Sequence, residues 1–253
     1  MRLAALFTVY DGLELLGKAI TACYDHVDEI VLCYQTVSNT GKESTSAKEF
    51  CENFRGEHGY TVIEYRTQKV NPKDNERNKH QVMIDAAKGL KCTHFYLSAT
   101  DHFYLSNQFE YAKTVAEKSD LDLTFTSIFT YYKFPEWQIT PIEDYFMPFI
   151  TKLYPDTGII INSARYPLRV DPSVRVNRFD KWLLFDESEV MLHHYSMVRD
   201  NIRSKLMNSA SSFKYDVQEA HAREHDNYDI SVNPGISYFK GRKVQVVPNY
   251  FSI

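Results

Sequence analysis

One short stretch places a carboxylate and an imidazole where many α/β proteins bind ligands. Residues Thr93–Leu97 form a β-type run, a small polar turn follows at Ser98–Thr100, and Asp101 and His102 come next. In an alternating α/β chain, both side chains then lie just beyond the carboxyl end of a strand, the edge at which open sheets bind ligands. Because Mg²⁺ and Mn²⁺ accept carboxylate oxygen and Mn²⁺ also accepts imidazole, the stretch predicts a divalent-metal site in an enzyme acting on a phosphorylated donor. The alternative is that Asp101 only caps the next helix or turn.

A second pair of imidazoles occurs far along the chain. His193 and His194 fall in a run that alternates as a strand, so their rings should point to opposite faces and only one can readily reach a metal. Arg199 and Lys205 follow, near a predicted helix start. These cations could hold a diphosphate and help it leave, whereas each residue taken alone is also common as an ordinary structural side chain.

The first 65 residues alternate between strand and helix patterns. Three apolar runs have strand length, at Leu3–Val9, Val27–Tyr34 and Tyr60–Tyr65. The first helix is expected to start with Asp11 as its cap and Glu14 reaching back, and a second helix is expected over Ala47–Phe54. This β-α-β-α-β order predicts a parallel sheet with helices on both faces.

The pattern changes character at about residue 130. The alternation first continues through Glu76–Leu90 (helix), Thr93–Leu97 (strand), Phe109–Ala116 (helix) and the β-rich run Leu121–Tyr131. Residues Tyr132–Pro155 contain four prolines and predict an ordered irregular segment. Beyond it we expect strands at Gly158–Ile161, Tyr166–Val170 and Glu189–Tyr195, helices at Met197–Ser209 and Val217–His225, and a hairpin at Ile236–Val247. The sequence thus predicts one α/β domain with a mostly parallel, Rossmann-like sheet and a mixed, elaborated carboxyl half.

Composition and missing motifs exclude several classes of protein. The net charge of −4 argues against a basic nucleic-acid coat protein. Neither GxGxxG nor GxxxxGK[ST] occurs, which argues against a dinucleotide-binding Rossmann domain and a P-loop NTPase. The four cysteines lack CxxC spacing and are interpreted as buried thiols in a reducing compartment. The apolar run at the amino terminus is too short to span a membrane and has no cleavage site, so we expect a cytoplasmic protein.

Taken in order, six segments resemble the GT-A class of glycosyltransferases, in particular the inverting family-two-like members of bacteria and phages. They are LAALFTVYDGLELL, DEIVLCYQTVSNTG, ERNKHQVMIDAAK, THFYLSATDHFY, YPLRVDPSVRV and HHYSMVRDNIRSKL, and they span about residues 3–208. The resemblance implies a donor-nucleotide pocket after the first two strands and along the helix before the fourth. The residues that match these roles are Thr8, Tyr10, Glu14, Gln35, Ser38, Arg77 and Asn78.

The resemblance also implies a metal centre. Asp101 matches the last residue of the usual Asp-x-Asp metal motif, whereas the first Asp of that motif is replaced by Ala99 and the residue after the motif is His102. A histidine late in the chain often completes such a centre, and His193 or His194 would supply it.

An inverting transferase needs a general base because the acceptor hydroxyl must lose its proton as it attacks. Family members place acceptor residues in the segment that is proline-rich here, so Glu143 or Asp144 is expected to be the base. Trp137 and Tyr132 are expected to stack on the acceptor.

The resulting prediction is a metal-dependent glycosyltransferase that uses a nucleotide-diphosphate sugar, most simply a UDP-sugar, with Mn²⁺ or Mg²⁺. Residues 1–130 would bind the nucleotide sugar, and residues 131–253 would bind the acceptor and complete the metal and diphosphate site. The acceptor would be a saccharide or a hydroxymethylated base of phage DNA. In the DNA case, the basic stretch Arg165, Arg169, Arg175, Arg178 and Lys181 would contact phosphates, although it could equally be a solvated face.

Two rival functions remain open from the sequence. One is a non-catalytic nucleotide-sugar-binding relative that has lost a metal carboxylate. The other is a nucleotidyltransferase, which would release pyrophosphate from a nucleoside triphosphate. The sugar, the acceptor and the oligomeric state are not determined by the sequence.

Overall fold

The structure is a computed structural model, and it describes residues 1–68, 70–160, 166–208 and 215–253. The helices in these ranges are α1 (Leu13–Tyr24), α2 (Ser46–Glu52), α3 (Pro72–Gly89), α4 (Ser106–Lys118), α5 (Ile202–Asn208), α6 (Tyr215–Asn227) and the 3₁₀ helix η1 (Pro172–Val174). The strands are β1 (Leu3–Val9), β2 (Glu29–Tyr34), β3 (Tyr60–Glu64), β4 (His94–Ala99), β5 (His102–Phe103), β6 (Leu123–Tyr132), β7 (Trp137–Thr140), β8 (Met147–Lys152), β9 (Trp182–Leu184), β10 (Met191–Met197), β11 (Gly235–Ile236) and β12 (Arg242–Val246).

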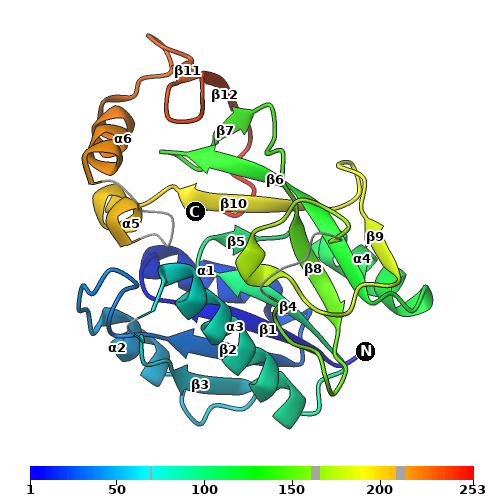
Figure 1. Cartoon of the computed structure of the whole chain (residues 1–253). Helices are drawn as coiled ribbons and strands as arrows, with labels where there is room; N and C mark the ends of the chain where they lie inside the picture. Colours follow the sequence, from blue (N-terminus) through cyan, green and yellow to red (C-terminus); the bar gives the residue numbers. More distant parts are fainter. Residues whose placement is uncertain (69, 161–165, 209–214) are drawn as a thin grey trace.

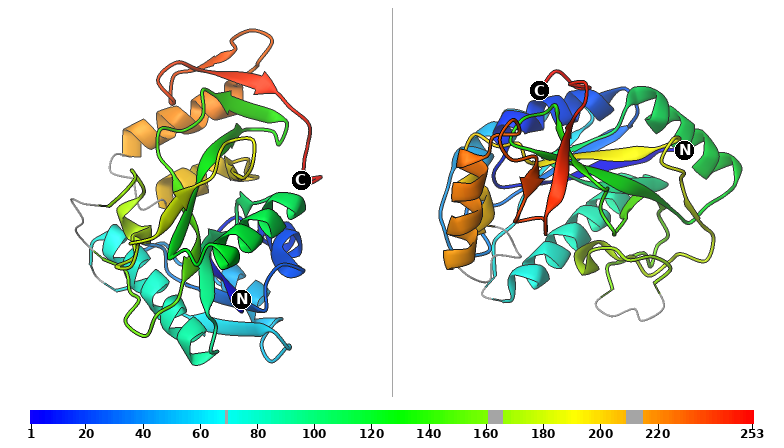
Figure 2. Two further views of the ribbon diagram at one scale, coloured as in Figure 1. Left: turned by 90° about the vertical axis from the view of Figure 1, so that its right-hand side faces the viewer. Right: turned by 90° about the horizontal axis from the view of Figure 1, so that it is seen from above.

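The amino-terminal half is a parallel sheet covered by helices on both faces (Figure 1). Strands β3, β2, β1 and β4 lie in that order and pair in parallel. Along β1, Leu3, Ala5 and Phe7 pack into one hydrophobic cluster with α1 and α4, while Ala4 and Leu6 pack into a second cluster with α3. This alternation follows from the two-residue period of a strand. The predicted parallel sheet is therefore confirmed, and Figure 2 shows α1 and α3 on opposite sides of it.

The carboxyl half is mixed and is organised around β6. This strand pairs antiparallel with β7 and β8 and parallel with β9 and β10. Strand β8 in turn pairs antiparallel with β4, which joins the two halves into one sheet. The predicted single α/β domain with an elaborated carboxyl half is confirmed, and the division between residues 130 and 131 falls inside β6.

The predicted starts of α1 and α3 are wrong for identifiable reasons. Helix α3 begins at Pro72 rather than Glu76, because the Asn71 side chain caps it by accepting from the Lys73 backbone N–H at 2.9 Å and proline suits the first turn. Helix α1 is preceded by Gly12 with a left-handed φ of 72°, and no side chain caps it. Asp11 is therefore not the cap.

The segment after residue 131 is more regular than predicted. It contains β7 and β8, whereas Tyr166–Val170 is not a strand and β9 was not predicted. The predicted hairpin is confirmed as β11 and β12, with Lys240 and Gly241 both at left-handed φ. Residues 158–160 of the predicted strand Gly158–Ile161 contain only an isolated bridge at Ile159, and the helix predicted from Met197 begins at Ile202 because Met197 ends β10. The predicted ends of these elements, Ile161 and Ser209, lie outside the described residues.

All four cysteines are buried free thiols, as predicted, and they are Cys23, Cys33, Cys51 and Cys92. Within the described ranges, no helix combines the length and the apolar character needed to cross a membrane.

Candidate active site

A cavity of about 310 Å³ opens at the carboxyl ends of β1, β2 and β4. The sheet order changes direction between β1 and β4, which is the point where open α/β sheets bind ligands. Strand β4 continues to Ala99, so the chain turns at Thr100 and Asp101 rather than at Ser98 as predicted. Side chains from α3, β10 and α5 complete the wall, so both halves of the domain contribute to one site.

Asp101 is the electrostatic centre of this cavity. Its side chain is buried, and its Oδ2 accepts hydrogen bonds from the Arg199 guanidinium and from Lys205 Nζ at 3.3 Å. Its Oδ1 lies 3.8 Å from Nε2 of His102 and 3.8 Å from Nε2 of His194. Burial opposes ionisation of Asp101, but the charges of Lys205 and Arg199 outweigh it and hold the pKa of this carboxyl well below its usual range. Asp101 is therefore an anion at neutral pH.

His102 and His194 form a cross-strand pair beside that carboxylate. They are direct partners in the antiparallel β5–β10 ladder, and their ring centroids are 5.0 Å apart. Burial lowers the pKa of His102 to about 4 and that of His194 to about 3, despite the nearby Asp101. Both rings are therefore neutral at pH 7, which is the form that binds metal ions.

The three groups fit a divalent metal ion. One ligand atom from each of Asp101, His102 and His194 lies within 4.8 Å of the others. Two imidazole nitrogens and one carboxylate oxygen suit Mn²⁺, Zn²⁺ or Fe²⁺ better than Mg²⁺, which prefers oxygen ligands. The donor set thus favours Mn²⁺ over Mg²⁺ among the two metals predicted from the sequence.

His193 does not reach this cluster. Its Nδ1 lies 2.7 Å from the Tyr131 hydroxyl on the opposite side of β10. The predicted divergence of the two rings is therefore confirmed, and the structure selects His194 as the one that faces Asp101.

The Arg199 guanidinium can reach Asp101 because Gly12, which lies beside it, has no side chain. The guanidinium is buried, lies 3.9 Å from Glu14 and donates to the Thr100 hydroxyl at 3.3 Å. A Cβ atom on Gly12 would overlap this guanidinium. Gly12 therefore serves two needs, a left-handed φ and the close approach of Arg199.

We expect Gly12→Ala to weaken binding of the nucleotide diphosphate predicted from the sequence about tenfold, equivalent to about 1.4 kcal/mol, because Arg199 must leave its place beside Asp101. Backbone strain should also lower the free energy of unfolding by about 1–2 kcal/mol. Isothermal titration with UDP measures the first effect and urea unfolding the second. Gly56→Ala is the matched control, since Gly56 also has positive φ but a Cβ atom added there would meet nothing within 4 Å. Equal UDP affinity in both variants would contradict the role given to Gly12.

The far end of the cavity carries two buried acceptor oxygens without partners among the described residues, Gln35 Oε1 and Asn39 Oδ1. The Asn39 amide nitrogen donates to Glu76 Oε1 at 2.8 Å, which fixes the orientation of that amide. Lys79 is also buried and lies 3.0 Å from Glu76. Unpaired buried acceptors are costly, so this end suits a ligand that supplies N–H or O–H groups.

The structure sorts the residues expected to bind the donor into two groups. Those that line the cavity are Thr8, Tyr10, Gln35, Arg199 and Lys205. Ser38 instead shapes the following loop, because its hydroxyl accepts from the backbone N–H groups of Thr40 and Lys42. Glu14 lies against Arg199. Arg77 and Asn78 lie inside α3 rather than at its start, and Arg77 pairs with Asp74.

A second cavity of about 230 Å³ adjoins the first, and the imidazole pair lines both. Six residues line both cavities, namely Thr8, Glu76, Ala99, His102, Asp171 and His194. Its remaining wall is largely apolar and is formed by Leu97, Ile128, Tyr145, Met147, Val174 and Leu192, together with the polar His80 and Ser98. The metal-ligand cluster therefore stands at the junction of a polar and an apolar compartment.

The residues expected at the acceptor line neither cavity. Glu143 accepts from Arg242 at 2.7 Å and from Thr130 at 2.9 Å, and Asp144 pairs with Arg169 at the surface. Tyr132 is fully buried against Tyr228 and other aromatic rings, so it cannot stack on an acceptor. Trp137 packs on Phe134 and Tyr228.

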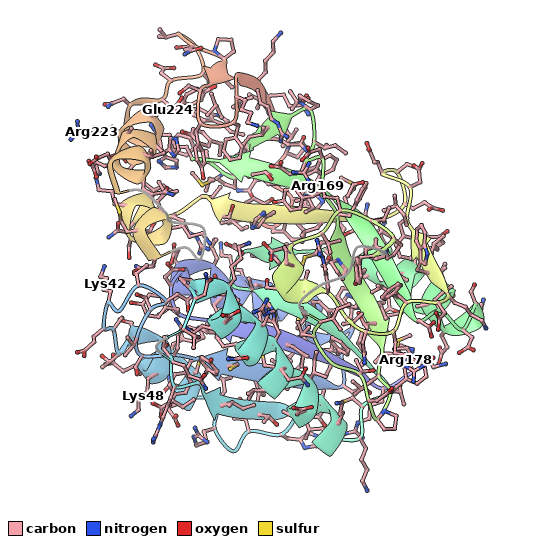
Figure 3. All side chains as sticks on the ribbon, in the orientation of Figure 1. Lys42, Lys48, Arg169, Arg178, Arg223 and Glu224 are labelled. Atoms are coloured by element: carbon pink, nitrogen blue, oxygen red, sulfur yellow. The ribbon has the colours of Figure 1, made fainter. Side chains whose placement is uncertain are left out.

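The basic stretch does not form a continuous patch of free charge in the described residues. Arg169 pairs with Asp144, Arg178 with Asp156 and Lys181 with Asp120, while Arg175 donates to a backbone carbonyl. Figure 3 shows Arg169 and Arg178 well apart on this face. Arg165 lies outside the described residues.

Comparison with known structures identifies the fold. A crystal structure of residues 1–349 of TarS from S. aureus, a glycosyltransferase, aligns with a TM-score of 0.50 at 11% identity, covering 91% of this chain and 72% of that one. A longer TarS structure also aligns at 0.50, with 10% identity, covering 92% of this chain and 45% of that one. The fold is GT-A-like. No protein-family model and no curated sequence matches the chain.

Several residues of the site were not predicted from the sequence. They are Asn39, Lys73, Glu76, Lys79, Asp171 and Asn208. The pair Asn71-Pro72 is typical of a helix start. It could have predicted the longer α3 and thereby placed Lys73 at the cavity. The sequence Asp171-Pro172-Ser173 is likewise typical of a helix cap and could have predicted that the Asp171 carboxylate is held in place. In the structure, Asp171 Oδ1 accepts from the Ser173 N–H at 2.8 Å.

Proposed function

We propose that this protein is a metal-dependent, inverting glycosyltransferase that moves a sugar from a UDP-sugar to an acceptor hydroxyl. One observation carries the proposal. At the ligand-binding edge of the sheet, the buried Asp101 faces two neutral imidazoles with one oxygen and two cations with the other. This arrangement suits a metal ion and a diphosphate side by side.

Different residues of the site would bind the metal ion, the diphosphate and the nucleoside. Asp101, His102 and His194 would hold the ion, which when bound supplies positive charge against the departing diphosphate. Arg199 and Lys205 line the same cavity as Asp101 and would bind the diphosphate oxygens. Gln35 and Asn39 would accept hydrogen bonds from the base or ribose at the far end. TarS has been crystallised with UDP and with UDP-GlcNAc; for this chain, the polar cavity itself is the reason for proposing a nucleotide sugar.

The second cavity supports a site for the incoming acceptor. The attacking oxygen must approach the sugar from the side opposite the diphosphate. Arg199 and Lys205 line the first cavity and not the second, whereas His102 and His194 line both. Residues 131–253 contribute several of its walls, in line with their expected role in acceptor binding. We propose a saccharide acceptor, since the described cations that would contact phage DNA are engaged with neighbouring groups.

Asp171 is the proposed general base. Of the two carboxylates that line both cavities, Glu76 is tied to Lys79 and Asn39, and their influence outweighs burial and lowers its pKa to about 2. Asp171 keeps Oδ2 with only Lys73 at 3.3 Å. Burial opposes its ionisation, but the Ser173 N–H and Lys73 hold its pKa below the usual value, so the carboxylate is present at neutral pH. The acceptor proton would pass to Asp171 as the new glycosidic bond forms and the bond to the diphosphate breaks.

A thermal-shift screen of nucleotide sugars with and without Mn²⁺ tests the proposal. At about 100 times Kd, a bound donor stabilises by about 2.7 kcal/mol, which corresponds to a rise in Tm of about 5–10 °C for a chain of this size. We expect a UDP-sugar to give this rise only with Mn²⁺, and release of UDP once an acceptor is added.

The same assay separates the rival functions. A non-catalytic relative would show the thermal shift without UDP release, even with acceptors. A nucleotidyltransferase would release pyrophosphate from a nucleoside triphosphate. No shift with any nucleotide sugar would remove the support for a transferase.

A further inference from the structure

The two candidate imidazole ligands rest on a very short strand. Strand β5 has only two residues, His102 and Phe103, and β10 is its one strand partner in the described sheet. In that ladder His194 faces His102 and His193 faces Phe103. Because neighbouring residues of a strand point to opposite faces, the pair that faces the cavity is backed by Phe103 and His193 on the other face.

An aromatic ring from the other end of the sequence covers this back face. The Phe251 ring centroid lies 5.0 Å from that of Phe103, 5.2 Å from that of His193 and 6.0 Å from that of Tyr195. Phe103, His193 and Tyr195 are themselves at most 2% exposed. Phe251 therefore contacts both strands of the ladder at once, directly behind the two ligands.

The segment that carries Phe251 is anchored on both halves of the domain. On one side, the Val247 N–H donates to the Glu136 carbonyl at 2.8 Å and the Asn249 amide donates to the Glu136 carboxylate at 3.1 Å. On the other side, Lys18 of α1 donates to the Ser252 carbonyl. These anchors hold the ring in place independently of the contacts it makes with the ladder.

We infer that Phe251 is a positioning residue for the metal centre: it fixes the spacing of His102 and His194 by packing behind β5 and β10. This inference rests on the proposed metal site. A two-residue strand has little hydrogen bonding of its own to resist movement, so its position depends on packing. Without the ring, β5 is free to shift toward the vacated space and carry His102 away from His194. Supporting residues around metal ligands commonly change affinity about 10–100-fold when they are replaced.

The test compares Phe251→Ala with Phe54→Ala and Phe251→Leu. Phe54 is a partly buried phenylalanine that packs against the same hydrophobic cluster but touches Phe50 and Tyr60, far from β5 in the sheet order. Co²⁺ is the probe, because its visible absorption reports ligand geometry as well as affinity. We expect Phe251→Ala to weaken Co²⁺ binding about tenfold or more and to alter the spectrum, Phe54→Ala to lower Tm without either change, and Phe251→Leu to restore part of the affinity.

A second readout does not need a metal. The imidazole ¹⁵N resonances of His102 and His194 in the metal-free protein should move in Phe251→Ala and stay in place in Phe54→Ala. If Phe251→Ala leaves these resonances unchanged, the positioning role is overturned, whatever the metal does. If wild-type protein binds no Co²⁺ while the resonances respond as expected, the metal site is wrong and the packing role of Phe251 stands.

Discussion

Asp101→Asn is expected to abolish detectable Mn²⁺ binding and to reduce sugar transfer by at least about 100-fold, which corresponds to about 2.7 kcal/mol in the transition state. The substitution keeps the shape of the side chain but removes the charge shared by the imidazole pair, Arg199 and Lys205. Titration calorimetry with Mn²⁺ and an assay of UDP release measure the two effects.

The same substitution should also destabilise the fold, and this effect must be separated from loss of function. Arg199 is 2% exposed in its side chain and would lose its nearer charged partner, keeping only Glu14 at 3.9 Å, and breaking a buried pair of this kind typically costs about 3–5 kcal/mol. Activity is therefore compared at a temperature well below the Tm of the variant. Transfer at the wild-type rate by folded Asp101→Asn protein would refute the metal-centre assignment.

The second large effect concerns the general base. Asp171→Asn should reduce transfer by about 10²–10⁴-fold while leaving Mn²⁺ and UDP affinity close to wild type, because Asp171 contacts none of Asp101, His102 and His194 in the hydrogen bonds described. Stability should change little, since asparagine also caps a helix start well. Initial rates at saturating donor and acceptor measure the loss.

Two further variants are compared with Asp171→Asn: Asp144→Asn tests a rival base, and Asp156→Asn is the control. Asp144 is one of the two candidate bases predicted from the sequence, the other being Glu143, and Asp156 is a surface carboxylate that pairs only with Arg178 among the described side chains. Loss of activity in Asp144→Asn with full activity in Asp171→Asn would reverse the assignment made from the structure. Asp156→Asn controls for the removal of a surface charge.

The rule that ligands bind where a strand ends was sufficient to predict the centre of the candidate site, Asp101 and His102, but not the residues around it. Asp101 and His102 were found because a strand followed by polar residues marks the ligand-binding edge of a sheet. The choice between His193 and His194 depended on the register of β10 against β5, which pairs residues about ninety positions apart. Local sequence patterns carry no information on such a register.

The differences between the predicted and the proposed residues at the periphery have a common physical origin. The acceptor side was predicted from sequence order, yet Glu143 and Asp144 are engaged by Arg242 and Arg169 from distant segments. Conversely, Asp171 reaches the cavity because η1 packs against α3, with His80 bonded to the Ser173 carbonyl at 2.8 Å. Long-range packing decides which carboxylates line the cavities, and residue spacing carries no information about it.

The position of β6 has a consequence for the cooperativity of the whole chain. This strand is paired with β7, β8, β9 and β10, and through β8 it is continuous with the parallel strands of the amino-terminal half. A cut between residues 130 and 131 would divide the strand that these partners share. The two halves proposed to bind the nucleotide sugar and the acceptor therefore belong to one folding unit, and loss of hydrogen bonds along β6 would disturb both sides of the candidate site at once.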